Sequence, residues 1–195
     1  DYTASLVGYT DSPKNLVISK NISYESGKFK VTSIGNYAFD KCTSLTSVTI
    51  PDSVTSIGNY AFNGCRSLTD VTIGNSVTSI GEYAFNGCES LTSVTIPNSV
   101  TSIESCAFFN CTSLTSVTIP DSVTSIGGSV FYGCTNLEKV DYIGTVSQWK
   151  SISGYSNVSQ IVKCSDNIII NENTVTINNL KYKINNDYTA SLVGY

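Results

Sequence analysis

The sequence contains no histidine, and this absence excludes several kinds of chemistry at once. Histidine is the most common general base and the most common metal ligand in proteins, so a histidine-dependent catalytic triad is impossible. The acidic residues occur singly, without a recurrent pair of carboxylates of the kind that glycosidases use, and no phosphate-binding glycine loop is present. We therefore expect no enzymatic activity and no bound cofactor.

Charged residues are few, and long apolar runs are missing. Only 13% of the residues are charged, and the 11 basic residues are scattered among 15 acidic ones, which gives a net charge of -4. This distribution argues against nucleic acid as a partner. No run of 18 apolar residues occurs, and the first residues do not have the order of a signal peptide, so we expect no membrane insertion. Because methionine is also absent, we expect a piece of a longer protein or a processed product.

What the chain does contain is a repeat of 23 residues. With 41% hydrophobic residues, the chain is too apolar to be disordered. Copies of the repeat begin at Leu45, Leu68, Leu91 and Leu114. The first copy reads LTSVTIPDSVTSIGNYAFNGCRS. Rows of one apolar type recur at this spacing, such as Val48, Val71, Val94, Val117 and Val140, or Phe39, Phe62, Phe85, Phe108 and Phe131. A strict period of this length indicates a solenoid of stacked repeats.

Each repeat contains the signals of two short strands and a turn. LTSVTI alternates apolar and small polar residues, which predicts a strand with Val48 and Ile50 facing inward. Pro51 ends this strand, and VTSIG supplies a second extended piece. NYAFNG fits one helical turn closed by Gly64 in a left-handed conformation.

The pattern L-x-x-V-x-I-P-x-x-V-x-x-I-x-x-x-A-F-x-x-C resembles the leucine-rich repeats of the BspA-like class, also called the Treponema pallidum type. The resemblance implies a right-handed, curved solenoid whose LTSVTI strands form a parallel sheet on the concave side. It also implies a cell-surface or secreted protein that binds other proteins, including host matrix proteins. The repeats depart from the pattern at Val130 and Tyr142, and Ile22 stands where the first leucine is expected, so we expect distorted terminal rungs.

The predicted fold is thus a mainly β repeat solenoid with short helical turns and β-rich end caps. We expect an N-terminal β cap over 1–30, about five rungs over 31–142, and a C-terminal cap over 143–195. In the C-terminal cap, Thr145 can begin a short helix that ends before Gly154 and places Trp149 over the last rung. Asn-rich turns predict strands near Thr174 to Ile177, Lys181 to Ile184 and Tyr188 to Val193.

Five of the seven cysteines recur once per repeat: Cys42, Cys65, Cys88, Cys111 and Cys134. A zinc ladder is disfavoured because no C-x-x-C pair occurs. Disulfides between adjacent rungs are possible by distance, but the side chains would have to leave a shared inward direction. We predict a structural row of buried thiols that act as small hydrophobic residues. Cys106 and Cys164 stand outside this row.

The outward positions of the predicted strands are candidates for a binding surface. They are Ser47, Thr49, Asp70, Thr72, Ser93, Thr95, Ser116, Thr118, Lys139 and Asp141. They suit a protein or glycan partner, although serine and threonine also simply fit exposed strands. Ice binding is a further alternative, which concave curvature and the alternation with serine oppose. A second row, Tyr37, Tyr60 and Tyr83, is either a contact patch or a stack along the array.

The first nine residues, DYTASLVGY, recur without change as residues 187–195. The sequence therefore predicts a larger unit repeated in tandem, with head-to-tail strand exchange between molecules through 187–195. For the chain as a whole we predict a non-catalytic interaction module of a cell-surface or secreted protein, with adhesion to host or matrix proteins as its role. The alternative is a structural spacer within a large tandem-repeat surface protein.

Overall fold

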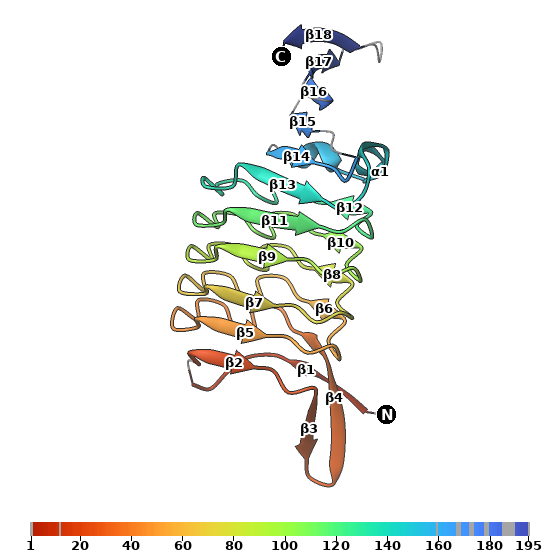
Figure 1. The fold of residues 1–195 in the computed structure, drawn as a ribbon. Helices are drawn as coiled ribbons and strands as arrows, with labels where there is room; N and C mark the ends of the chain where they lie inside the picture. The colour runs from red at the N-terminus through yellow and green to blue at the C-terminus, as the bar shows by residue number, and fades with distance from the viewer. Residues whose placement is uncertain are drawn as a thin grey trace.

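The computed structural model describes residues 2–11, 13–158, 160–166, 169–171, 174–177, 180–184 and 190–194. The repeats stack along one axis as a β-solenoid (Figure 1). One wall contains the LTSVTI strands, which are β5 (Ser47–Thr49), β7 (Asp70–Thr72), β9 (Ser93–Thr95), β11 (Ser116–Ile119) and β13 (Lys139–Tyr142). This wall also contains β2 (Asn15–Val17) before them and β14 (Ile161–Lys163) after them, so the ladder extends beyond 31–142 at both ends.

The second wall contains the shorter strands of the TSIG segments. These are β6 (Ser56–Ile57), β8 (Ser79–Ile80), β10 (Ser102–Ile103) and β12 (Ser125–Ile126), and they continue the longer β1 (Tyr2–Leu6) and β4 (Gly27–Ile34). They form one parallel sheet in the order β1-β4-β6-β8-β10-β12, to which β3 (Asn21–Tyr24) adds an antiparallel strand on β4. The two-residue strands β6, β8 and β10 persist because each has a strand on both sides, and β12 has β10 on one side and a bridge from Ser125 to Ser153 on the other. The repeat solenoid predicted from the period is confirmed.

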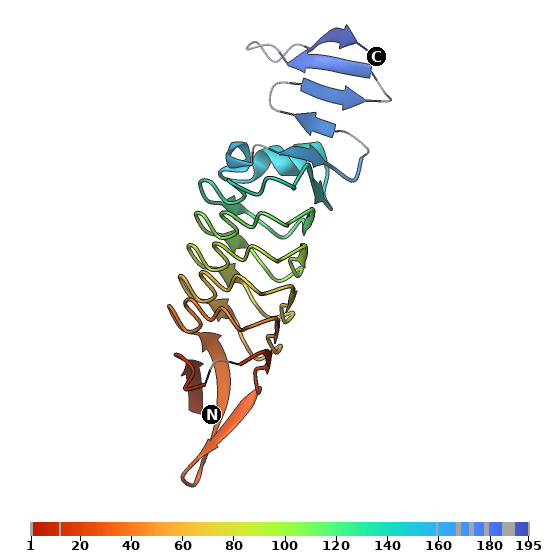
Figure 2. The same ribbon diagram turned by 90° about the vertical axis from the view of Figure 1, so that its left-hand side faces the viewer.

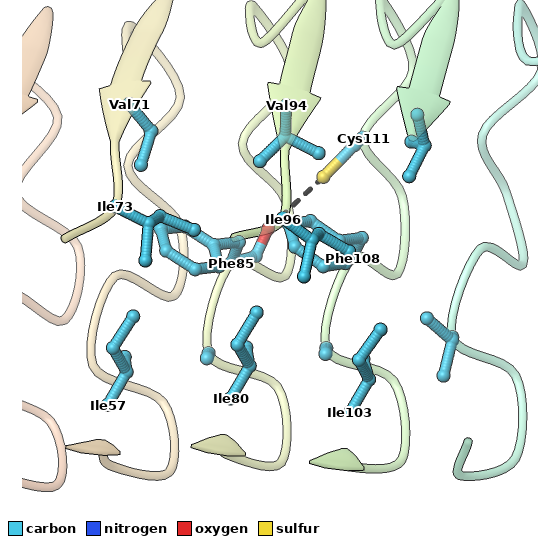
Figure 3. Close-up of a cluster of buried hydrophobic side chains, with 14 of the residues drawn as sticks. Ile57, Val71, Ile73, Ile80, Phe85, Val94, Ile96, Ile103, Phe108 and Cys111 are labelled. Carbon is cyan, nitrogen blue, oxygen red and sulfur yellow. Dashed lines mark hydrogen bonds between the residues drawn. The ribbon is translucent and has the colours of Figure 1, made fainter. Parts of the chain in front are cut away.

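The core between the two walls consists of the recurrent apolar rows. The phenylalanine rings stack from rung to rung, and the ring centroids of Phe39 and Phe62 are 5.1 Å apart and those of Phe62 and Phe85 5.2 Å apart. All five phenylalanines of this row are buried, and the isoleucine and valine rows pack beside them (Figure 3). In most rungs an identical side chain therefore packs on an identical side chain, which explains why the phenylalanine and cysteine positions repeat.

The NYAFNG segments do not form the expected helical turn, because Tyr60 adopts a left-handed φ of 57°. Successive amides alternate in direction instead. The amide of Asn63 donates to the carbonyl of Tyr60 within the rung, whereas the amide of Phe62 donates across to Ala84 of the next rung. The segment thereby joins the rungs as a third ladder. The left-handed conformation predicted at Gly64 is present, with φ at 67°.

At the N-terminal end, β1 and β2 belong to an additional partial rung. Leu16 of β2 pairs with Val48, and Tyr9 stacks on Phe39 at the end of the phenylalanine row. The expectation that Ile22 occupies the leucine position of a rung is wrong. Ile22 lies in β3 (Asn21–Tyr24), which forms a hairpin with β4, and its side chain is 44% exposed. The hairpin projects beyond the stack (Figure 2), so counting back 23 residues places Ile22 incorrectly.

At the C-terminal end, the rung of Val130 is regular, because Val130 is buried and β12 pairs with β10. Tyr142 is buried in register with Ile119, but its rung departs from the repeat after β13, as expected. The final rung contains α1 (Val146–Ser151) in place of a turn, followed by η1 (Tyr155–Asn157). Thr145 begins α1 with a reciprocal capping pair to Gln148, as the sequence predicts.

An antiparallel sheet continues from the last rung. It consists of β15 (Ile169–Asn171), β16 (Thr174–Ile177), β17 (Leu180–Ile184) and β18 (Ala190–Gly194), which pair in sequence order from β14. The strands predicted near 174–177 and 181–184 are therefore present. The prediction for 188–189 lies outside the described residues, and the remainder of that strand is part of β18. Within the described residues, no helix is long and apolar enough to cross a membrane.

Candidate functional site

The ten outward positions predicted from the sequence share one surface, which we call the strand face. They lie on β5, β7, β9, β11 and β13, while the valine between each pair points into the core. Each residue is exposed or partly exposed. Strand pairing places Ser47 beside Asp70 and Thr49 beside Thr72, so the residues form two parallel rows. The structure therefore brings all ten together on one face.

The charged end of the strand face is largely neutralised. Lys139 and Asp141 stand on β13 and form an ion pair, with 3.0 Å between the lysine Nζ and the carboxylate Oδ1. Asp70, in contrast, belongs to no ion pair within the described residues. It is the one acidic residue in the serine and threonine part of the face, so it gives the middle of the face a local negative charge.

Threonines that flank the strand face differ from those on it in their hydrogen bonding. Thr69 and Thr115 precede their strands, and each donates its hydroxyl to the backbone carbonyl of the rung before, at 3.0 Å. On the face itself, Ser47 donates to the side chain of Asn15. Six hydroxyls on the face have no partner among the described residues, those of Thr49, Thr72, Ser93, Thr95, Ser116 and Thr118. Flanking threonines stabilise the stack, whereas these six hydroxyls are free to bind a partner.

A hollow divides the strand face between β7 and β9. The ladder is interrupted there, since β7 ends one sheet and β9 ends the other. The hollow has a volume of about 440 Å³ and is lined by Asp70, Val71, Thr72, Ile73, Asn75, Ser93, Thr95 and Pro97. Four of the predicted face residues thus line a single concave site. No residue pattern within one repeat indicates this hollow in the sequence.

The five cysteines of the predicted row are buried inside the rungs, and all seven cysteines of the chain are free thiols. Four of them donate a hydrogen bond from sulfur to a phenylalanine carbonyl of the rung before, as in Cys65 to Phe39 at 3.2 Å and Cys111 to Phe85 at 3.2 Å. Figure 3 shows the bond from Cys111. Burial raises the pKa of Cys65 to about 12. No group of three or more potential metal ligands occurs within the part of the chain that the structure describes.

The aromatic row is longer than the sequence indicates. Tyr37, Tyr60 and Tyr83 stack with centroids 4.9 Å apart at each step. The next rung has Cys106 at this position, but Phe109 takes over the row at 6.4 Å from Tyr83, and Tyr132 continues it at 5.3 Å. Phe109 and Tyr132 lie outside the 23-residue register of the tyrosines, so a search at one fixed position misses them. We call these five residues the aromatic stripe.

Comparison with known proteins agrees with this geometry. The sequence model of the BspA type leucine rich repeat region matches residues 32–161 in six copies. No curated protein sequence matches the chain significantly. Among solved structures, a leucine rich cell surface protein from Faecalibacterium prausnitzii is 39% identical, with a TM-score of 0.68 over 76% of this chain. A leucine rich repeat protein from T. pallidum is 33% identical, with a TM-score of 0.65 over 69% of this chain.

This chain is shorter than these two relatives and matches only part of each of them. The chain spans 38% of the first and 61% of the second, and it covers 85% of a 38% identical leucine-rich repeat protein from Bacteroides capillosus, with a TM-score of 0.55. The sequence match alone, over residues 32–161, includes more than half of the chain. The chain belongs to the BspA-type leucine-rich repeat family.

Proposed function

We propose that this chain is a non-catalytic interaction module of a bacterial cell-surface or secreted protein, and that it adheres to a host or matrix protein, or to a glycan, through the strand face. The observation that carries the proposal is the hollow between β7 and β9, where Asp70 and unpartnered hydroxyls meet in one concave site. The cell-surface description of the Faecalibacterium prausnitzii relative supports the location.

The chemistry of the hollow defines what it can recognise. Thr72, Ser93 and Thr95 offer hydroxyls that donate and accept hydrogen bonds, and Asp70 offers a carboxylate that only accepts. A hydrogen-bonding partner with a donor directed at Asp70 fits such a site, for example an arginine or lysine side chain or a sugar hydroxyl. The surrounding hydroxyls then fix the orientation of this partner.

The proposal is tested on an array of extracellular matrix proteins and glycans, with affinities measured by surface plasmon resonance. Asp70→Arg should weaken the binding of any ligand found by at least about tenfold, because it reverses the charge inside the hollow. Glu82→Arg is the matched control, because it makes the same charge change next to Tyr83 of the aromatic stripe, away from the strand face. Thr95→Arg should act as Asp70→Arg does, because its bulk fills the hollow.

The alternative function, a spacer that holds other domains away from a surface, is favoured by the continuity of the stacked rungs from β2 to β14. A spacer predicts no saturable binding to any member of the array. If Glu82→Arg weakens binding as strongly as Asp70→Arg does, the binding surface is the side of the aromatic stripe instead of the strand face.

A further inference from the structure

The duplicated nonapeptide forms a strand in two different surroundings. In its first copy, β1 lies parallel to β4, at the edge of the sheet in the second wall. In its second copy, β18 lies antiparallel to β17, at the edge of the other large sheet. The two strands share the residues ASL, which are residues 4–6 in β1 and 190–192 in β18. One sequence therefore pairs with two unrelated neighbours.

The first copy occupies a defined binding position, formed by β4 and Phe39, which we call the seat. The carbonyl of Leu6 accepts a hydrogen bond from the amide of Gly35, and Leu6 pairs with Ile34 while its side chain packs against the core. Tyr9 stacks on Phe39 with the two rings only 3° from parallel and their centroids 5.7 Å apart. Val7, between them, is 76% exposed. The seat thus recognises a leucine and, three residues later, a tyrosine.

This seat lies beside the first rung of the described stack. A hollow of about 460 Å³ opens there, and its apolar lining includes Leu16, Ile18, Val31 and Phe39 together with β1 itself. A solenoid end without a neighbouring rung exposes its core and needs a cap. The strand that occupies the seat therefore helps to cover the N-terminal end.

We propose that the seat on β4 also accepts β18 of a second copy of this chain, which replaces β1 and links the molecules head to tail. The replacing strand has the same nine residues, so each backbone and side-chain contact of the first copy can be remade by the second. Such an exchange of identical elements is a low-cost route to association. In the described part of the chain β18 has a strand neighbour on one side only, so its second edge can pair with β4 of another molecule.

Because β1 and β18 have the same sequence, β1 blocks the seat in the wild-type chain, and association should be strong only in a variant that releases β1. The chain's own β1 is tethered beside the seat and competes at an effective concentration on the order of millimolar. Leu6→Asp places a charge against the core and should release β1, while the second copy at 187–195 stays intact. We expect the weight-average mass of Leu6→Asp in sedimentation equilibrium to rise from that of a monomer to at least a dimer at ~100 µM chain, well above the wild type.

Two double variants decide the outcome. Adding Leu192→Asp to Leu6→Asp should restore the monomer, because Leu192 is the counterpart of Leu6. Adding Val193→Asp is the matched control and should leave the assemblies intact, because its counterpart Val7 is exposed. A monomeric Leu6→Asp, or assemblies that persist with Leu192→Asp, would overturn the proposal.

A peptide experiment covers the case in which Leu6→Asp disturbs the fold, which circular dichroism would show. Fluorescently labelled DYTASLVGY should bind saturably to the wild-type chain by displacing β1, and the peptide with aspartate in place of its leucine should not bind. Equal binding of both peptides, or no binding of DYTASLVGY at millimolar concentration, would overturn the proposal as well.

Discussion

At the scale of single residues, the cysteine row shows how a solenoid fills a small position inside each rung. The carbonyl of Phe39 accepts the amide of Cys42 from its own rung and the thiol of Cys65 from the next. A thiol is small and apolar enough for the core, and it is a weak donor that needs no stronger partner. Cysteine therefore packs with the phenylalanine row without a buried unpaired polar group.

The buried thiols predict that stability falls in alkali. Burial raises the pKa of Cys65 to about 12 and that of Cys88 well above its usual range, so both stay protonated in the folded chain while the unfolded chain ionises near pH 9. The unfolded state then binds fewer protons, and the free energy of unfolding should decline above pH 9 by about 1.4 kcal/mol per pH unit for each such thiol.

Urea unfolding of the reduced protein at pH 7, 9, 10 and 11 measures this decline. Tyrosines such as Tyr142, whose pKa is raised by burial, contribute to the total, so the comparison is made with Cys65→Ala. That variant should show a shallower decline by the share of one thiol. An unchanged slope in Cys65→Ala would contradict the prediction.

The sequence shows some residue positions more clearly than others. Apolar identity at a fixed spacing is sufficient to locate the buried valine, phenylalanine and cysteine rows, because a repeated residue at a repeated position packs against its own copy in the next rung. It cannot reveal the left-handed φ of Tyr60, which is unusual for an aromatic residue and is held by the hydrogen bond from its amide to Glu82 of the next rung. That conformation is determined by a contact between repeats and not by the backbone preference of tyrosine itself.

At the scale of elements, stability comes from the neighbours of each strand. β6 and β8 are two residues long, too short to persist alone, and each is held between two strands of the same kind. An insertion disturbs this order locally. The hairpin of β3 and β4 separates β2 from the regular repeats, so Leu16, not Ile22, pairs with the next rung. The hollow between β7 and β9 likewise depends on packing between rungs, which the pattern within one repeat does not contain.

The helix α1 covers the last rung through its buried residue Trp149. Trp149 is 1% exposed and meets Tyr142 edge to face, with 5.1 Å between the ring centroids. Trp149→Ala should lower the free energy of unfolding by about 3–5 kcal/mol, because it opens a cavity over the last rung. Hydrogen exchange should rise in β13 and β14 and remain unchanged in β5 and β7. Val146→Ala, on the same helix but only partly buried, should have a smaller effect.

A fully folded and equally stable Trp149→Ala would show that α1 does not cap the array. A uniform rise in exchange from β5 to β14 would show a different property, namely that the rungs unfold together and not from the end. The two measurements therefore separate the role of the tryptophan from the cooperativity of the stack.

At the scale of the whole molecule, each rung should contribute a similar amount to the free energy of unfolding, but the rungs differ in the surface that they offer to a ligand. Each one contacts only the rungs before and after it, and these present nearly the same surfaces. Stability should then be close to a sum over rungs and their interfaces. The strand face is different, because Asp70 lines the hollow between β7 and β9, whereas the corresponding positions of the other rungs hold serine or lysine.

Excision of a single period separates these two properties. Removing 68–90 or removing 114–136 deletes 23 residues and rejoins a serine to a leucine, so the ladder can close again in register. Both variants should fold, with the denaturant m-value lowered by about 12% in proportion to the lost surface. Only the first deletes Asp70 and the hollow, so a ligand of the strand face should bind the second variant as it binds the full chain and fail to bind the first. Loss of folding in either variant would contradict the additivity of the rungs, and equal binding by both would contradict the assignment of the hollow.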